Sequence, residues 1–140
     1  MLDEASLSAA LAGLCGTSAG ADVVSAFLFG SRIEGRAHRE SDVDAAVLLD
    51  PMLGPRQRFE ARLRLSAELI AALHCNDIDL VVLNDAPPLF ARRVVREGRR
   101  VWCRDARADH AFRRDIQLRA ADLEPFVERG RRALLARALR

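Results

Sequence analysis

Two aspartates, Asp42 and Asp44, lie two positions apart at the start of a stretch that is otherwise apolar. In a β-strand, side chains at positions i and i+2 point to the same face, so a strand here would hold both carboxylates together. Two such anions repel each other unless a proton or a cation lies between them. Carboxylate oxygens on a rigid strand suit Mg²⁺. The pair therefore indicates a metal site, although an isolated pair is also typical of solvent-exposed charge at a strand end.

A third aspartate, Asp79, lies in a second apolar run, Ile78 to Leu83. A carboxylate in a buried strand needs a partner or a metal, because its charge is costly to remove from water. If the two strands are neighbours, Asp79 completes a site of three carboxylates. Asp77 would share the face of Asp79 but lies nearer the strand entry, so it is a reserve candidate.

A phosphate-binding turn is predicted directly after the first apolar run, Val23 to Phe29, where Gly30 and Ser31 follow. A glycine at this position lets the backbone approach a phosphate closely. A serine hydroxyl, together with the amides of a following helix start, can bind the phosphate oxygens.

The stretch FLFGSRIEGRAHRESDVDAAVLL resembles the signature of the nucleotidyltransferases of the DNA polymerase β superfamily. In that signature Gly-Ser is followed by ten residues and then by Asp-x-Asp, and ten residues separate Ser31 from Asp42. The resemblance covers roughly residues 20–105. It implies that Gly30, Ser31 and Arg32 bind the triphosphate of a nucleotide. His38, in the same segment, could also touch the triphosphate.

The resemblance also implies the chemistry of the carboxylates. Asp42 and Asp44 would bind two Mg²⁺ ions, and Asp79 would complete one of the two metal sites and help to activate the acceptor hydroxyl. The implied substrate is ATP. All three aspartates would then be catalytic residues as well as metal ligands.

The hydrophobic periodicity predicts helices and strands in alternation. This mixture is typical of an α/β or α+β domain, a polymerase-β-like mixed sheet flanked by helices. We expect a single domain over residues 1–140, with a core over about 20–105 and a helical tail over about 106–140. The expected elements are a helix over 6–14, strands over 23–29 and 42–49, a helix over 56–73, a strand over 78–83, a helix over 87–98, a strand over 100–103, and a helical remainder with a break near 123–125.

Composition narrows the class of protein. No apolar run approaches the roughly 20 residues that cross a bilayer, and the acidic start lacks the basic flank of a secretory signal, so we expect a cytoplasmic protein. The three cysteines, Cys15, Cys75 and Cys103, are widely spaced and form no CxxC motif. They are therefore expected to be small buried apolar residues and not disulfide partners or zinc ligands.

The charge is unevenly distributed. Residues 1–89 contain 7 Arg and 13 Asp or Glu, a net charge of −6, whereas residues 90–140 contain 15 Arg and 7 Asp or Glu, a net charge of +8. The basic half is either a solvated helical surface or a docking face for an acidic partner. Direct binding of nucleic acid is less expected, because the chain has few aromatic side chains for base stacking.

The short length and the tail, with VWCRD and then Asp122-Leu-Glu-Pro125 and an arginine-rich end, resemble the MntA-type antitoxins. These minimal nucleotidyltransferases pair with HEPN-domain ribonuclease toxins. The resemblance implies transfer of AMP from ATP to a tyrosine of the toxin, which neutralises it, within a hetero-oligomer. Two alternatives remain open: a nucleotidyltransferase that modifies a small molecule such as an antibiotic, and an antitoxin that blocks its toxin by binding alone.

Overall fold

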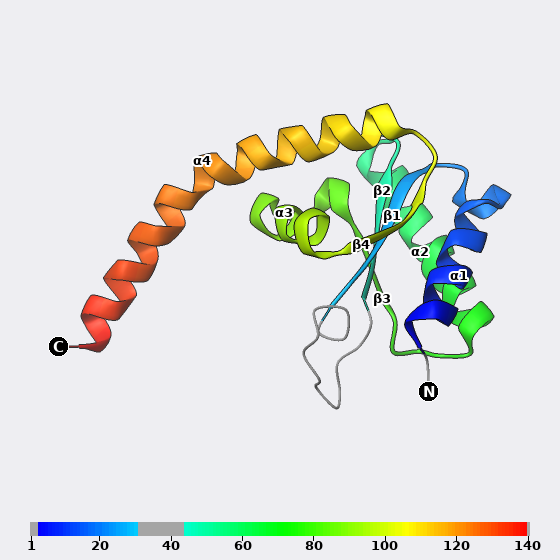
Figure 1. The fold of residues 1–140 in the computed structure, drawn as a ribbon, viewed down its shortest axis with the longest axis horizontal. Coiled ribbons are helices and arrows are strands. Elements are labelled where there is room, and N and C mark those ends of the chain that lie inside the picture. The colour runs from blue at the N-terminus through cyan, green and yellow to red at the C-terminus, as the bar shows by residue number, and fades with distance from the viewer. Residues whose placement is uncertain (1–2, 31–43, 140) are drawn as a thin grey trace.

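The computed structural model describes residues 3–30 and 44–139. The predicted elements are present with small shifts in their ends (Figure 1). In chain order they are α1 (Glu4–Cys15), the 3₁₀ turn η1 (Ser18–Gly20), β1 (Val23–Phe29), β2 (Asp44–Leu49), α2 (Pro55–Leu73), β3 (Asp79–Val82), the 3₁₀ turn η2 (Leu83–Asp85), α3 (Pro88–Glu97), β4 (Arg99–Cys103) and α4 (Ala106–Ala138).

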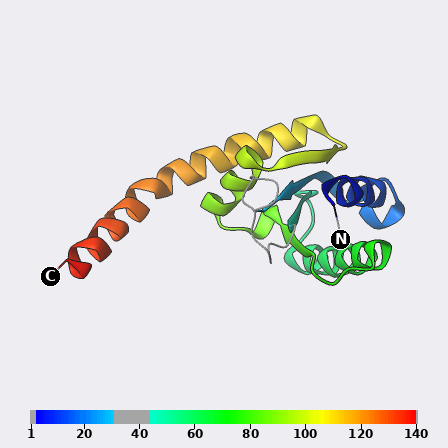
Figure 2. The same ribbon diagram turned by 60° about the horizontal axis from the view of Figure 1, so that its bottom comes forward.

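The four strands form one mixed sheet in the order β3-β2-β1-β4. β1 pairs antiparallel with both β2 and β4, whereas β3 pairs parallel with β2. Helices α1 and α2 cover one face of the sheet, and α3 with the first half of α4 covers the other (Figures 1 and 2). This arrangement confirms the predicted fold class, a mixed sheet flanked by helices with a helical C-terminal tail.

Alternation along the strands builds two hydrophobic clusters. In β2, Ala45, Val47 and Leu49 join the cluster under α1 and α2. Their neighbours Ala46 and Leu48 join the cluster under α3 and α4. Because successive side chains of a strand point to opposite faces, Asp44 belongs to the face of Ala46, the face that α3 and α4 cover.

A buried polar network holds α4 to the sheet. The Asp109 side chain on α4 is only 3% exposed, and it accepts a hydrogen bond of 2.7 Å from the Ser25 hydroxyl on β1. Its other carboxylate oxygen accepts hydrogen bonds of 2.9 Å from Arg100 on β4 and from Arg113 on α4. The Arg113 guanidinium also lies over the Phe27 ring. A buried carboxylate is tolerated here because its oxygens are paired with these donors.

The break expected near residues 123–125 is wrong, since α4 continues unbroken through Pro125. A proline inside a helix removes the hydrogen bond to the carbonyl four residues earlier. That carbonyl belongs to Ala121, which lies on an exposed part of the helix where water can replace the missing donor. Figure 1 shows α4 curving over its outer half, as expected of a helix that accommodates a proline.

The outer half of α4 extends away from the body of the protein (Figures 1 and 2). Its inner half packs against α3 through the buried Ile116 and Ala120. The same helical stripe continues as Leu123, Val127 and Leu134, which are 38%, 52% and 68% exposed. The helix therefore carries an apolar stripe beyond the part of the body that could cover it.

The described helices include none that is long and apolar enough to cross a membrane. The three cysteines are free thiols. Cys15 is buried in the cluster under α1, as predicted, whereas Cys75 and Cys103 are half-buried.

Removing the Asp109 carboxylate should be costly, because it leaves Ser25 and two arginines without their acceptor. We expect Asp109→Ala to lower the free energy of unfolding by about 3–5 kcal/mol, measured by urea denaturation. The control is Asp115→Ala on the same helix, which removes an exposed ion pair with Arg119 and should cost less than about 1 kcal/mol. Equal losses in the two variants would contradict the structural role given to Asp109.

Burial raises the pKa of the Cys15 thiol to about 12. In a Cys75→Ser/Cys103→Ser variant, the remaining Cys15 should therefore not react with a disulfide reagent at pH 8 until urea unfolds the protein. The unfolded thiol loses its proton at a lower pH than the folded one, so the stability should also fall as the pH rises from the unfolded pKa toward 12. Rapid reaction of the folded variant would show that Cys15 is accessible.

Candidate functional site

The strand register brings two of the predicted carboxylates together. Asp44 on β2 pairs with Asp79 on β3, and on its other side it pairs with Phe29 on β1. Neighbouring strands lie about 4.8 Å apart, so the two aspartates lie side by side at the end of the sheet where β2 and β3 begin. A cation between them would relieve the repulsion of two adjacent anions.

Both carboxylates project from the same face of the sheet. Asp79 shares its face with Val81, which packs into the cluster under α3 and α4. Asp44 shares its face with Ala46, which belongs to the same cluster. Asp44 is half-buried and Asp79 is exposed, so the site opens to solvent on the β3 side.

Gly30 directly follows β1 at this same end of the sheet. Its φ of 118° lies in the region that favours glycine, because a side chain there would clash with the backbone. The predicted turn after the first strand is thus a position where the chain needs glycine. At this end of the sheet, the end of β1 therefore lies beside the starts of β2 and β3.

Four of the predicted residues lie outside the residues that the structure describes: Ser31, Arg32, His38 and Asp42. Their roles in binding the triphosphate and the metal stay predictions. The reserve candidate, Asp77, is exposed and precedes β3, whereas Asp79 is the first residue of the strand. Only Asp79 is paired in register with Asp44, which favours it as the third carboxylate.

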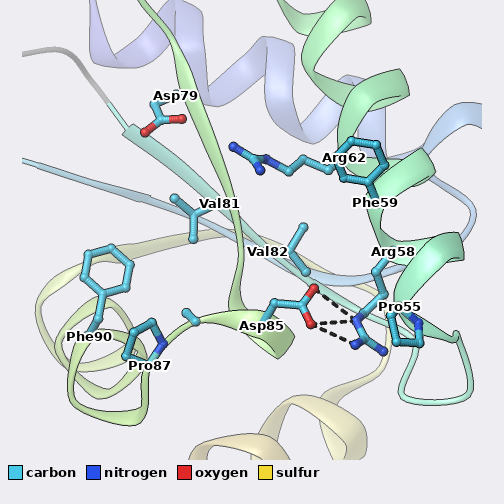
Figure 3. Close-up of a pocket in the computed structure, with 11 residues that line it drawn as sticks. Pro55, Arg58, Phe59, Arg62, Asp79, Val81, Val82, Asp85, Pro87 and Phe90 are labelled. Carbon is cyan, nitrogen blue, oxygen red and sulfur yellow. Dashed lines mark hydrogen bonds and ion pairs between the residues drawn. The ribbon is translucent and has the colours of Figure 1, made fainter.

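A groove runs along the free edge of β3, with Asp79 at one end (Figure 3). We call it the β3 groove. It has a volume of about 630 Å³, within the range of small-molecule and side-chain binding sites. Phe59 and Arg62 of α2 form one wall, and Phe90 of α3 lies on the other side of Val81.

Two arginines of α2 are held in place along the β3 groove. Arg58 forms an ion pair of 2.8 Å with Asp85 and donates a hydrogen bond to the Leu53 carbonyl. Arg62 donates a hydrogen bond of 3.1 Å to the Leu80 carbonyl, which points outward from the edge strand. Arg62 thus covers part of the strand edge and protects it from pairing with another chain.

The donor set fits Mg²⁺, because Asp44 and Asp79 offer carboxylate oxygens on adjacent strands. Within residues 3–30 and 44–139, no group of three His, Cys, Asp or Glu side chains is placed to hold a metal. The third ligand predicted from the sequence, Asp42, lies outside this part of the chain. The described pair is therefore two thirds of the predicted carboxylate set.

A family model described as polymerase beta nucleotidyltransferase matches residues 17–107, more than half of the 140 residues. The chain belongs to this nucleotidyltransferase family. The matched range contains Gly30, Asp44 and Asp79 and the whole edge of the sheet that carries them. The resemblance to the polymerase β superfamily is confirmed.

Several individual proteins are similar to this chain in sequence or in structure. The protein adenylyltransferase MntA of Shewanella oneidensis is 40% identical over 76 residues, which are 54% of this chain and 51% of that protein. The alignment thus spans about half the length of the curated relative. A chain of a toxin–antitoxin crystal structure with AMP-PNP is 28% identical, with a TM-score of 0.55, and the match covers 85% of this chain and 88% of that one. A chain of a mutant toxin–antitoxin MntA–HpeT structure is 26% identical, with a TM-score of 0.61 over 100% of both chains.

Apart from Asp79, the residues of the β3 groove were not predicted from the sequence. One signal was present: Phe59 is a large apolar residue off the buried stripe of α2, which consists of Ala61, Leu65 and Leu69. It is 56% exposed in the structure. Phe90 gave no such signal, because it follows two prolines in a helix with many apolar residues.

Neutralising one carboxylate of the adjacent pair should separate metal binding from folding. Without metal, Asp79→Asn should be more stable than the wild type by about 1 kcal/mol, because it removes repulsion with Asp44. Millimolar Mg²⁺ should raise the melting temperature of the wild type and of the control Asp77→Asn, but not of Asp79→Asn. An equal response of all three proteins to Mg²⁺ would contradict the assignment of Asp79 as a ligand.

Proposed function

We propose that the chain is a Mg²⁺-dependent nucleotidyltransferase that transfers AMP from ATP to a tyrosine of a HEPN-domain ribonuclease toxin and thereby neutralises the toxin. The observation that carries this proposal is the register of Asp44 against Asp79 at the edge of a sheet of the polymerase β nucleotidyltransferase family. The proposed location is the cytoplasm, where ATP is available.

The proposed reaction follows from the placement of the groups. The acceptor oxygen forms a bond to the α-phosphorus of ATP, the bond from that phosphorus to the bridging oxygen breaks, and pyrophosphate leaves. In the proposed reaction Asp79 would accept a hydrogen bond from the acceptor hydroxyl and orient it, and that proton would pass to a carboxylate or to water. Bound Mg²⁺ would supply positive charge at the entering and leaving oxygens. Gly30, with Ser31 and Arg32, would hold the triphosphate.

The choice of AMP and ATP rests on the relatives. The curated relative is named a protein adenylyltransferase, and one similar chain comes from a structure with AMP-PNP, an ATP analogue. Both support an adenine nucleotide as the substrate. The alignment with the curated relative covers only about half of that protein, which is why the activity is proposed for this chain.

A protein partner fits the outer half of α4. The exposed stripe of Leu123, Val127 and Leu134 offers apolar area to a partner, and residues 129–139 contain four arginines and no acidic residue. A helix with this pattern is typical of a surface that binds another helix with acidic flanks. Similar chains occur in toxin–antitoxin structures, which supports a toxin as the partner.

The direct test is to incubate the protein with ATP, Mg²⁺ and its proposed partner, a HEPN-domain toxin, and to measure intact masses. We expect the mass of the partner to increase by whole AMP units. Asp44→Asn and Asp79→Asn should abolish the increase, whereas the control Asp77→Asn should retain it, because only the paired carboxylates would hold the Mg²⁺ that offsets the negative charge of the transition state.

Two results would overturn the proposal. An unmodified partner whose ribonuclease activity is nonetheless inhibited would indicate an antitoxin that acts by binding alone. Transfer of AMP to a small molecule, with no modification of the partner, would indicate the antibiotic-type reaction.

A further inference from the structure

The strand order sets the direction from which the acceptor arrives. In the order β3-β2-β1, Asp44 stands between Asp79 on one side and the end of β1, with Gly30, on the other. In an in-line displacement, the entering and leaving oxygens lie on opposite sides of the phosphorus. If the triphosphate is held at the end of β1, pyrophosphate leaves on that side. The acceptor hydroxyl must then enter from the side of β3.

The β3 groove opens on that side. β3 is an edge strand of the sheet, and among residues 3–30 and 44–139 no further strand lies beside Asp79. The groove extends from Asp79 to the ion pair of Arg58 with Asp85 (Figure 3). Arg62 lies between this ion pair and Asp79, so the groove is lined by two arginines and two aspartates, and Asp79 is the carboxylate that the ion pair with Arg58 leaves available for the proposed reaction.

The walls of the groove are aromatic and apolar. Phe90 is held in place by an edge-to-face contact with Phe29, whose ring centroid lies 5.6 Å away. Phe59 lines the groove from α2 and is 56% exposed, so its ring is accessible to a ligand that enters the groove. Val81 lies between the two walls (Figure 3). These surfaces suit a flat ring that carries a hydroxyl at one end.

From these observations we propose that the β3 groove is the acceptor subsite of the enzyme. The aromatic ring of a tyrosine from the partner protein packs against Phe59, Val81 and Phe90, and its hydroxyl reaches Asp79. Phe59 and Phe90 thereby select an aromatic acceptor and exclude the shorter side chains of serine and threonine, which cannot fill the groove. This inference rests on the proposed transfer of AMP to a protein tyrosine.

The test compares Phe59→Ala with a matched control, Leu63→Ala. Both side chains lie on α2, four residues apart, and are 56% and 55% exposed, but only Phe59 lines the groove. At saturating ATP, Phe59→Ala should raise the KM for the partner protein about 10-fold, the order expected for loss of an aromatic contact and its buried area. The KM for ATP should stay within about twofold of the wild type, and Leu63→Ala should leave both values unchanged.

Phe90→Leu provides a second variant, because it keeps most of the volume that packs on Phe29 and removes the aromatic ring. Its melting temperature establishes that it is folded, and the same rise in the KM for the partner is expected. In addition, a partner whose acceptor tyrosine is replaced by serine should be modified more slowly by the wild type, and Phe59→Ala should reduce that preference for tyrosine.

The outcomes separate this inference from the proposed function. A wild-type protein that transfers no AMP to any protein overturns both. A wild-type protein that transfers AMP, with Phe59→Ala and Phe90→Leu no worse than Leu63→Ala, overturns the acceptor subsite alone. A rise in the KM for ATP in place of the KM for the partner would identify the groove as the pocket for the adenine base and would also overturn the inference.

Discussion

Electrostatic repulsion between Asp44 and Asp79 is the central physical feature of the candidate site. The pairing of β2 with β3 places Asp44 against Asp79, and this arrangement costs free energy unless positive charge lies between them. The two carboxylates lie at the end of the sheet where Gly30 follows β1. The remaining elements keep that end of the sheet in place: two hydrophobic clusters fix the strands from both faces. A cation that binds between these two carboxylates would therefore stabilise the folded protein.

The Asp109 network that holds α4 to the sheet lies apart from the candidate site at Asp44 and Asp79. The buried Asp109 network joins β1, β4 and α4 on the side of β1 away from Asp44, so it can fix the long helix without adding charge to the site. Among the described residues, no strand pairs with the outer side of β3, and Arg62 donates a hydrogen bond to the Leu80 carbonyl there. The open strand is thus protected from aggregation while Asp79 stays accessible. The outer half of α4 is free to present its apolar stripe, since only the inner half contributes to the core.

Local sequence patterns predicted the strands and two residues of the candidate site, Gly30 and Asp44. The alternation around Asp44 and the position of Gly30 after an apolar run depend only on neighbouring residues. The order of the strands could not be predicted in this way, and the choice of Asp79 over Asp77 was decided by the register with Asp44. The arginines of the basic half were interpreted as one solvated or docking surface. In the structure, Arg99 pairs with Glu4 and Arg100 with Asp109, contacts between residues distant in sequence or on different elements. Pro125 was expected to break the tail helix, but its exposed surroundings let the helix continue.

Transfer of a nucleotide, and not of a phosphoryl group, is the reaction proposed for the site that contains Asp44 and Asp79. ATP labelled with ³²P at either the α or the γ position, incubated with Mg²⁺ and the proposed HEPN-domain partner, distinguishes the two reactions. Label is expected to enter the partner from α-labelled ATP only, and Asp79→Asn should abolish this transfer. Label that enters from the γ position, or transfer that persists in Asp79→Asn, would show that the proposed reaction is wrong.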